Sequence, residues 1–141
     1  MTESTHSFGE PFELARLSSQ IIADRTQIEK HDIALTLGSG WGKAADLLGE
    51  TTTTLDASEV PGFSSSGVPG HSGTIRSIAM PKGKTAQVIG ARPLYYEDKG
   101  VRAVVHSVRT AAASGEKVMI LTNGAGGIKD AWSPGQPVLI S

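Results

Sequence analysis

Two glycine-rich segments of the chain carry the groups best suited to hold an anion. The apolar run 33–37 leads into the loop 38–42 (GSGWG), and the apolar run 118–121 leads into the loop 122–127 (TNGAGG). Because glycine has no Cβ, an anion can come close to the backbone N–H groups of such loops. In an open α/β sheet these loops lie at the carboxyl ends of strands, where ligands bind. The pattern predicts one phosphate or oxyanion site built from two loops.

Neither loop matches a common nucleotide-binding motif. The P-loop needs Gly-x-x-x-x-Gly-Lys followed by Ser or Thr, but Leu37 stands at the first glycine and Ala44 follows Lys43. The dinucleotide motif needs Gly-x-Gly-x-x-Gly, and its last glycine is replaced by Lys43 in the first loop and by Lys129 in the second. The sequence therefore disfavours ATP and NAD sites. Each loop taken alone could also be an ordinary strand-to-helix turn.

Arg92 and Ser39 are further candidates for contacts with an anion. Arg92 ends an apolar run, where burial of an unpaired guanidinium would be costly. A phosphate dianion offers the planar, bidentate partner that arginine suits best. The alternative for Arg92 is a structural ion pair with Glu97 or Asp98. The Ser39 hydroxyl can donate to phosphate, although a serine at this position could instead cap the following helix.

Four motifs, in this order, resemble those of the trimeric purine nucleoside phosphorylases, a family that includes the methylthioadenosine phosphorylases. The resemblance covers most of the chain from about Ile33 onward and is strongest to the bacterial guanosine/inosine-type enzymes. Members of the family are about twice as long, so the chain resembles their amino-terminal half. The motifs are GSGWG at 38–42, VPGHSG at 68–73, Arg92 with Tyr96-Glu97, and TNGAGG at 122–127.

The resemblance assigns roles to individual residues. It implies that the loop bearing His71 closes over phosphate, with Gly70 and Gly73 as hinges; a surface histidine in a linker is the alternative. It implies that Tyr96 packs against the ribose, although this tyrosine could be a core residue. His106, within a predicted helix, is expected to be structural, and no catalytic residue or metal ligand is assigned. The implied phosphate-binding residues are Ser39, His71, Arg92, Leu94 and Gly124.

The chain departs from the family pattern in two places. The usual motif Gly-Arg-x-His-x-Tyr-Glu-Gly reads ARPLYYED at 91–98. Leu94 thus replaces a phosphate-binding histidine and can donate only its backbone N–H, while Pro93 restricts Arg92 toward extended geometry. The purine-binding Glu and Asn of the family would lie beyond Ser141. We therefore expect a truncated chain that does not turn over nucleosides by itself.

The activity implied by the resemblance is phosphorolysis of purine (deoxy)ribonucleosides to free base and (deoxy)ribose 1-phosphate. Phosphate, a co-substrate, would stabilise an oxocarbenium-like sugar, so that positioning and electrostatics supply most of the catalysis. No metal or organic cofactor is expected, and the complete enzyme is expected to be a homotrimer. The alternatives are a non-catalytic or degenerate phosphate-binding fragment and a methylthioadenosine phosphorylase.

Composition fits part of a cytoplasmic α/β enzyme. A length of 141 residues suits one domain, here the amino-terminal part of a phosphorylase domain (1–141) with no internal boundary. The net charge of −1 gives no electrostatic footprint for nucleic acid, and cysteine is absent. Charged residues interrupt the first thirty positions, which excludes a secretory signal. No apolar run is long enough to cross a bilayer.

The predicted elements form a mixed, largely parallel sheet flanked by helices. Helices are expected from Pro11, with an apolar stripe of Leu14, Leu17, Ile21 and Ile28, and over 101–112, with a valine-rich stripe ended by Gly115. A short helix is expected at 44–48. Strand-like segments are expected at 33–37, 51–55, 74–80, 85–91 and 118–121, with 74–80 and 85–91 as a hairpin and another strand beginning at 137–141.

Overall fold

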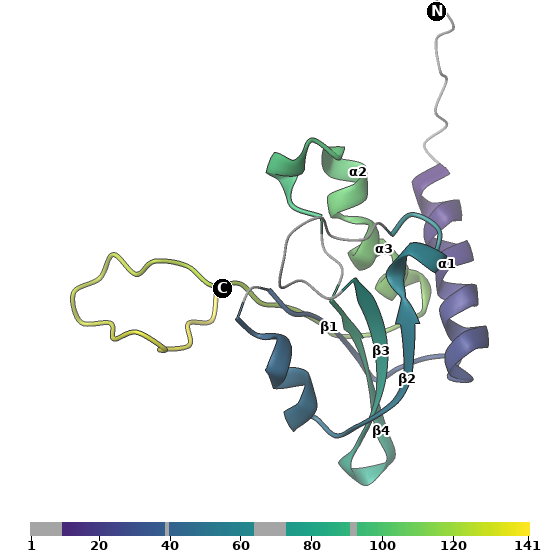
Figure 1. Cartoon of the computed structure of the whole chain (residues 1–141), viewed down its shortest axis with the longest axis horizontal. Coiled ribbons are helices and arrows are strands. Elements are labelled where there is room, and N and C mark those ends of the chain that lie inside the picture. Colours follow the sequence, from purple (N-terminus) through teal and green to yellow (C-terminus); the bar gives the residue numbers. More distant parts are fainter. Residues whose placement is uncertain (1–9, 39, 64–72, 91–92) are drawn as a thin grey trace, which may run out of the picture.

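A five-stranded mixed sheet lies at the centre of the computed structural model, which describes residues 10–38, 40–63, 73–90 and 93–141 (Figure 1). The strand order is β2-β3-β4-β1-β5, with β1 parallel to both β4 and β5 and antiparallel pairing along β2-β3-β4. The predicted mixed sheet flanked by helices is confirmed, but the sheet is not largely parallel as expected, because two of its strand pairings are parallel and two are antiparallel. The strands are β1 (Ile33–Thr36), β2 (Glu50–Asp56), β3 (Thr74–Met80), β4 (Lys84–Ile89) and β5 (Met119–Leu121).

Helices cover the sheet, and short 3-10 segments connect its strands. Helices α1 and α3 lie together on one side, and the 3-10 helix η1 lies apart from them near the end of β1 (Figure 1). The α-helices are α1 (Glu10–Thr26), α2 (Gly100–Val104) and α3 (His106–Ala113). The 3-10 helices are η1 (Gly42–Leu47), η2 (Ala57–Glu59), η3 (Pro81–Gly83) and η4 (Tyr95–Glu97).

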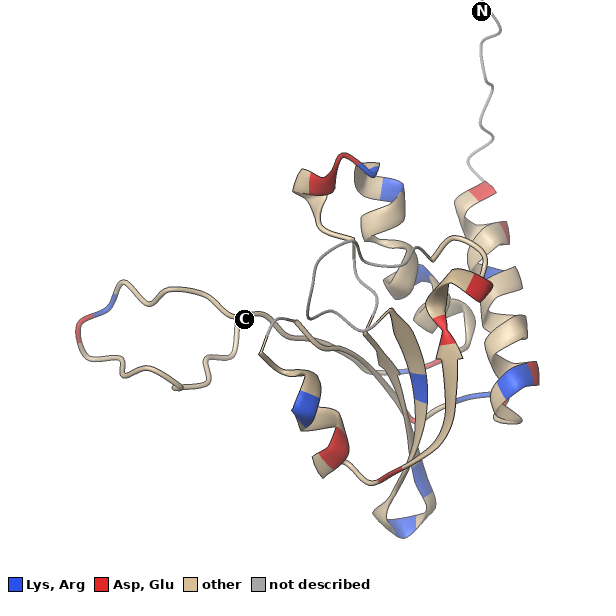
Figure 2. Cartoon of the chain, viewed as in Figure 1, with Lys and Arg blue, Asp and Glu red and all other residues tan. Residues whose placement is uncertain are grey.

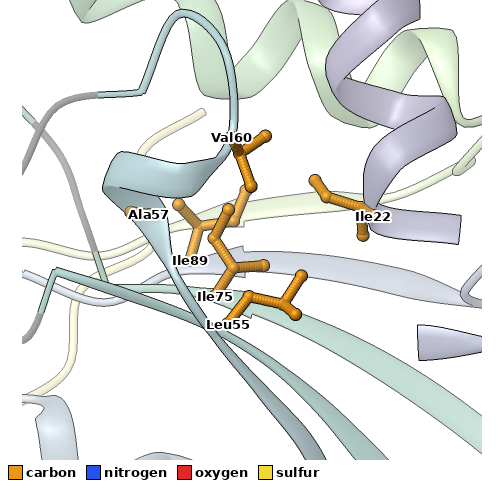
Figure 3. Close-up of a cluster of buried hydrophobic side chains, with 6 residues drawn as sticks. All are labelled: Ile22, Leu55, Ala57, Val60, Ile75 and Ile89. Atoms are coloured by element: carbon orange, nitrogen blue, oxygen red, sulfur yellow. The ribbon is translucent and has the colours of Figure 1, made fainter. Parts of the chain in front are cut away.

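Two apolar clusters give the sheet a buried core. The cluster in Figure 3 joins α1 to β2, η2, β3 and β4 through Ile22, Leu55, Ala57, Val60, Ile75 and Ile89. The second cluster joins β1, η1, β3 and β4 through Leu35, Leu37, Ala45, Ile78, Ala86 and Val88. Because consecutive side chains of a strand point to opposite faces, Val88 and Ile89 of β4 enter different clusters. This explains why the apolar runs of the sequence are continuous rather than alternating.

The predicted strands within 33–121 are confirmed, and so is the hairpin, whose turn is η3. The short helix predicted at 44–48 is the 3-10 helix η1. The strand predicted at 137–141 is wrong, because this segment has no regular structure and Val138, Leu139 and Ile140 are exposed. An extended segment becomes a strand only through a ladder of hydrogen bonds to a neighbour, and no described strand pairs with it.

The apolar stripe predicted for α1 is not its buried face. Leu14 and Leu17 are 36% and 46% exposed, and Ile28 follows the end of the helix. Only Ile21 of the predicted stripe packs against the core, where it is partly buried. The buried residues are Ala15, Ser18, Ile22 and Thr26. Most of these are small, which lets α1 approach its neighbours closely.

The single helix predicted over 101–112 is two helices, because Val105 between α2 and α3 departs from helical geometry (φ −93°, ψ 0°). Val101 and Val108 of the predicted stripe are exposed. The buried residues of α3 are instead His106, Ser107, Thr110 and Ala111. Small and polar residues thus form the contact between α3 and α1, where Ser114 Oγ donates to Ser19 Oγ at 2.9 Å.

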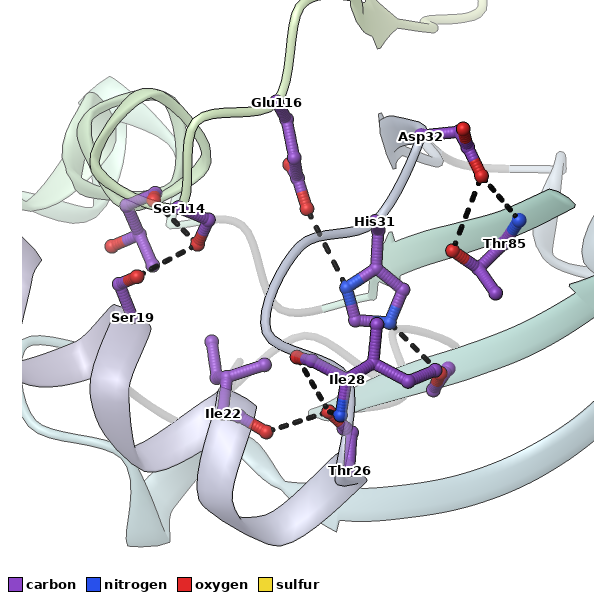
Figure 4. Close-up of polar contacts among 11 residues, drawn as sticks. Ser19, Ile22, Thr26, Ile28, His31, Asp32, Thr85, Ser114 and Glu116 are labelled. Atoms are coloured by element: carbon purple, nitrogen blue, oxygen red, sulfur yellow. Dashed lines mark hydrogen bonds and ion pairs between the residues drawn. The ribbon is translucent and has the colours of Figure 1, made fainter.

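A buried polar cluster lies at the amino ends of β1 and β5 (Figure 4). His31 Nε2 lies 2.8 Å from Ser77 Oγ, and His31 Nδ1 lies 3.7 Å from Glu116 Oε1. Burial raises the pKa of Glu116 to about 8. Burial also lowers the pKa of His31, against the opposing effect of the nearby Asp32 charge. Both groups are therefore uncharged near neutral pH, and their contact is not an ion pair there.

Candidate phosphate-binding site

The described strand ends that flank the four predicted motifs lie at one edge of the sheet. Thr36, at the end of β1, is paired with Ile89 of β4 and with Leu121 of β5, so these three strands end together. Strand β3 runs antiparallel to β4 and therefore begins at the same edge, where the Gly90 N–H donates to the Thr74 carbonyl at 2.8 Å. The chain segments that lead to the candidate residues enter or leave the sheet here.

Three of the six candidate residues, Ser39, His71 and Arg92, lie outside the described residues, so their assigned roles stay predictions. The other three are described. Leu94 is half-buried and precedes η4, and its carbonyl accepts the Glu97 N–H at 3.0 Å. Gly124 is exposed in an irregular segment.

Tyr96 is not a core residue, since 72% of it is exposed on η4. This exposure removes the alternative that the tyrosine serves only packing. Glu97 on the same turn has a side chain only 13% exposed and forms an ion pair with Lys99 at 3.1 Å. The Glu97 carboxylate thus has a cation beside it in the described part of this segment.

Thr122 joins the two glycine-rich loops, a role that sequence reasoning missed. Its hydroxyl accepts the Gly38 N–H at 3.0 Å and donates to the Thr36 carbonyl at 3.2 Å. Its own N–H also donates to the Thr36 carbonyl, at 3.0 Å. The signal available in the sequence was a hydroxyl residue at the exact junction of a strand and a glycine-rich loop.

Gly38 is required at this junction by a close approach of two backbones. A Cβ built on Gly38 would lie 2.6 Å from the Thr122 carbonyl oxygen and 3.1 Å from the Asn123 Cα. The contact confirms that the two loops lie side by side at their first residues. It also corrects one expectation, because the Gly38 N–H is already engaged by Thr122 and is not open to an anion.

His106 is a structural residue, as predicted. Its Nε2 lies 3.1 Å from Ser18 Oγ and 3.0 Å from the Pro61 carbonyl oxygen, and its ring meets Phe63 edge-on at 4.9 Å. Burial lowers its pKa, which the contact with the Pro61 carbonyl partly opposes. Through these contacts His106 of α3 connects the segment after η2 with α1.

The charge distribution of the described residues gives the site no large electrostatic patch. Basic and acidic residues are interspersed over α1 and the segment around α2 (Figure 2). The β3–β4 hairpin carries only basic residues, of which Arg76 pairs with Asp46 and Lys84 with Asp32. Among the residues that the structure describes, there is no group of three or more His, Cys, Asp and Glu suited to a metal ion. Within the same residues, no helix is long and apolar enough to span a membrane.

The sequence of this chain is similar to those of known proteins. The chain is 51% identical over 136 residues to a purine nucleoside phosphorylase from Cellulomonas sp, an alignment that covers 94% of this chain and 48% of that protein. It is 46% identical over 132 residues to the purine nucleoside phosphorylase of Mycobacterium tuberculosis, covering 94% of this chain and 49% of that protein. This chain is a relative of the purine nucleoside phosphorylases. It spans about half the length of the curated relatives it matches.

The fold agrees with this relationship. A crystal structure of a purine nucleoside phosphorylase in complex with ribose-1-phosphate superposes with a TM-score of 0.71 at 26% identity, covering 86% of this chain and 44% of that one. The Schistosoma mansoni enzyme complexed with a monocyclic inhibitor superposes with a TM-score of 0.70 at 26% identity, covering 86% of this chain and 43% of that one. No family model matches the chain.

Proposed function

We propose that this chain supplies the phosphate-binding part of a purine nucleoside phosphorylase. The reaction would be phosphorolysis of a purine (deoxy)ribonucleoside to free base and (deoxy)ribose 1-phosphate. The observation that carries the proposal is the 51% identity to a purine nucleoside phosphorylase along 94% of the chain. The common edge at which β1, β4 and β5 end, each just before one of the motifs, supports it, because an open α/β sheet binds its ligands at such an edge.

The proposed roles follow from the chemistry of each group. The Arg92 guanidinium would bind the phosphate dianion, with donors from Ser39, His71 and the Gly124 N–H. Leu94 would contribute only its backbone N–H. The bound anion would stabilise the positive charge that develops on the sugar as the purine leaves, and the exposed Tyr96 would contact the ribose.

The proposal also covers the co-substrate, the oligomeric state and the cellular location of the complete enzyme. Inorganic phosphate would be a co-substrate, with no metal or organic cofactor, and neither nucleic acid nor membrane would be a partner. The complete enzyme would be a homotrimer that acts in purine salvage in the cytoplasm.

Phosphate binding by the chain tests the first step. We expect inorganic phosphate to bind, and Arg92→Ala to weaken binding by roughly 1.5–3 kcal/mol, the range for hydrogen bonds to a charged group. Arg16→Ala is the matched control, since Arg16 is an exposed arginine of α1 that pairs with Glu13. If Arg92→Ala and the wild type have equal phosphate affinities in a calorimetric titration, Arg92 does not bind the phosphate.

A chimera tests the reaction. Residues 1–141 would replace the corresponding half of the Cellulomonas enzyme, to which the chain is 51% identical. We expect the chimera to release hypoxanthine from inosine only when phosphate is present, and to lose most of this activity with Arg92→Ala. A folded chimera without phosphate-dependent release would contradict the proposed function.

A second candidate is a phosphate-binding chain without catalytic capacity. One observation favours it, namely Leu94 at the position where the family motif has a histidine. The chimera separates the two candidates: an inactive chimera that gains phosphorolysis with Leu94→His would show that this substitution, and not the rest of the chain, had removed the activity.

A further inference from the structure

We propose that Thr122 is a positioning residue, whose hydroxyl fixes the spacing of the two glycine-rich loops and thereby sets the affinity of the site for phosphate. The inference rests on the proposed function, because it takes phosphate as the ligand of these loops. Thr122 would act through the loops and would not itself touch the anion.

The first argument is the hydrogen bonding of the hydroxyl. Gly38 begins one loop and donates its N–H to Thr122 Oγ1 at 3.0 Å. The same oxygen donates to the Thr36 carbonyl at 3.2 Å, beside the bond of 3.0 Å from the Thr122 N–H. One hydroxyl thus satisfies a donor in the first loop and an acceptor at the end of β1. Without it the N–H of the buried Gly38 would lose this partner, which favours a local rearrangement.

The second argument is the close packing at the same point. The backbone of Gly38 lies against the Thr122 carbonyl, so close that a Cβ on Gly38 would lie only 2.6 Å from the carbonyl oxygen. The two loops therefore cannot move closer together, and the Thr122 hydroxyl opposes their separation. Hydrogen bonds to an anion weaken with displacements of a few tenths of an ångström. An anion bound by donors from both loops is consequently sensitive to this spacing.

Thr26 provides a matched control for a purely structural effect. Its hydroxyl also bridges two backbone groups, because it accepts the Ile28 N–H at 3.3 Å and donates to the Ile22 carbonyl at 2.8 Å (Figure 4). Thr26 ends α1 and lies outside the candidate site. Replacing either threonine by valine preserves the side-chain shape and removes one bridging hydroxyl.

The experiment compares Thr122→Val, Thr122→Ser and Thr26→Val with the wild-type chain. Inorganic phosphate affinity is measured by calorimetric titration, and exchange of the Gly38 amide hydrogen by NMR. We expect Thr122→Val to weaken phosphate binding roughly 3- to 10-fold, the range for one lost hydrogen bond. Its Gly38 amide should exchange faster. Thr122→Ser should restore both properties to within about twofold, and Thr26→Val should leave both unchanged although it lowers thermal stability.

Each other outcome has a distinct meaning. If the wild-type chain binds phosphate and Thr122→Val binds it equally well, or if Thr122→Ser is as weak as Thr122→Val, the positioning role is overturned while the proposed function stands. If Thr26→Val weakens phosphate binding as much as Thr122→Val, the effect is general destabilisation and the inference is also overturned. Wild-type chain that binds no phosphate overturns the proposed function and this inference with it. If Thr122→Val does not fold, Thr122→Ala takes its place in the comparison. The wild type alone also tests the inference, because a Gly38 amide hydrogen that is not protected from exchange would overturn it.

Discussion

The two ends of the central sheet use polar groups in opposite ways. At the carboxyl ends of β1 and β5, the polar contacts are between backbone groups and one hydroxyl, and Gly38 packs directly against the Thr122 carbonyl. At the amino ends, ionisable side chains are buried, and His31 and Glu116 are both held uncharged near neutral pH. The carboxyl edge therefore keeps its geometry through close backbone contacts, whereas the amino edge depends on the protonation of two side chains.

This difference suits the proposed roles of the two ends. An edge that binds an anion needs backbone donors at fixed positions and little side-chain bulk. At the buried amino edge His31 and Glu116 remain neutral, since a charge would be costly there. If the comparison is correct, steric changes should dominate at the carboxyl edge and changes in pH at the amino edge.

The largest effect is expected for Gly38→Ala. The new methyl group would lie 2.6 Å from the Thr122 carbonyl oxygen, and because this atom belongs to the backbone it cannot simply rotate away. We expect the free energy of unfolding to fall by roughly 3 kcal/mol, the upper part of the range for overpacking. Thermal denaturation followed by circular dichroism measures the change. Gly42→Ala is the control, since a Cβ at Gly42 meets no atom within 4 Å, and an equal loss in both variants would contradict the steric explanation.

The next largest effect is expected at the opposite edge for Ser77→Ala. This change removes the partner of His31 Nε2 at 2.8 Å in a site where both residues are about 1% exposed. A buried polar atom left without its partner costs about 1–3 kcal/mol. Chemical denaturation of Ser77→Ala should show this loss, whereas Ser133→Ala, in an exposed segment, should stay close to the wild type. A Ser77→Ala variant with the same free energy of unfolding as the wild type would mean that the amino-edge cluster contributes nothing to stability.

Much of the sheet could be predicted from the sequence, because its signals are local. Two apolar runs that end in glycines mark β1 and β5, and η3 between two apolar runs marks the hairpin. The buried faces of the helices could not be predicted in this way. Serine, threonine and histidine form much of the contact between α1 and α3, and hydrophobic periodicity gives such residues no weight.

The sequence predicts the candidate site at an edge of the sheet, but it does not predict the contacts between the loops there. General rules for α/β sheets predict Leu94, Tyr96 and Gly124 near that edge, because each of them follows a predicted strand. The Thr122 hydroxyl bond to Gly38 depends on the exact register of β1 against β5, and a single sequence does not contain that register. The contact between Ser77 and His31 could not be predicted either, because it also depends on how the strands are aligned.

A smaller effect, visible only through its dependence on pH, is expected for Glu116→Gln. The folded chain keeps Glu116 protonated up to a pKa of about 8, against 4.5 for an unperturbed glutamate, so this residue lowers the wild-type stability progressively as pH rises from 4.5 to 8. His31 acts with the opposite sign, because its lowered pKa removes stability as pH falls below 6.5. In Glu116→Gln the first trend should disappear, leaving stability that rises with pH between 5 and 7, with a Tm above that of the wild type by roughly 2–5 °C at pH 8. Parallel curves of Tm against pH for the two proteins would contradict the assignment of a protonated Glu116.

The smallest effect is expected for Leu94→His at the carboxyl edge. This variant tests whether that edge can accommodate one more side-chain donor. Leu94 is half-buried just before η4, so a histidine of similar size can replace it without entering the core. An imidazole adds a donor where an isobutyl group has none, and one added hydrogen bond should tighten the binding of inorganic phosphate by about 1 kcal/mol. The gain should be larger at pH 6 than at pH 8, since a protonated imidazole attracts the anion more strongly. Leu47→His is the control for a histidine elsewhere on the surface, because Leu47 on η1 is 88% exposed. Unchanged or weaker phosphate affinity in Leu94→His would show that this edge is arranged around leucine, and that the family motif does not apply at this position.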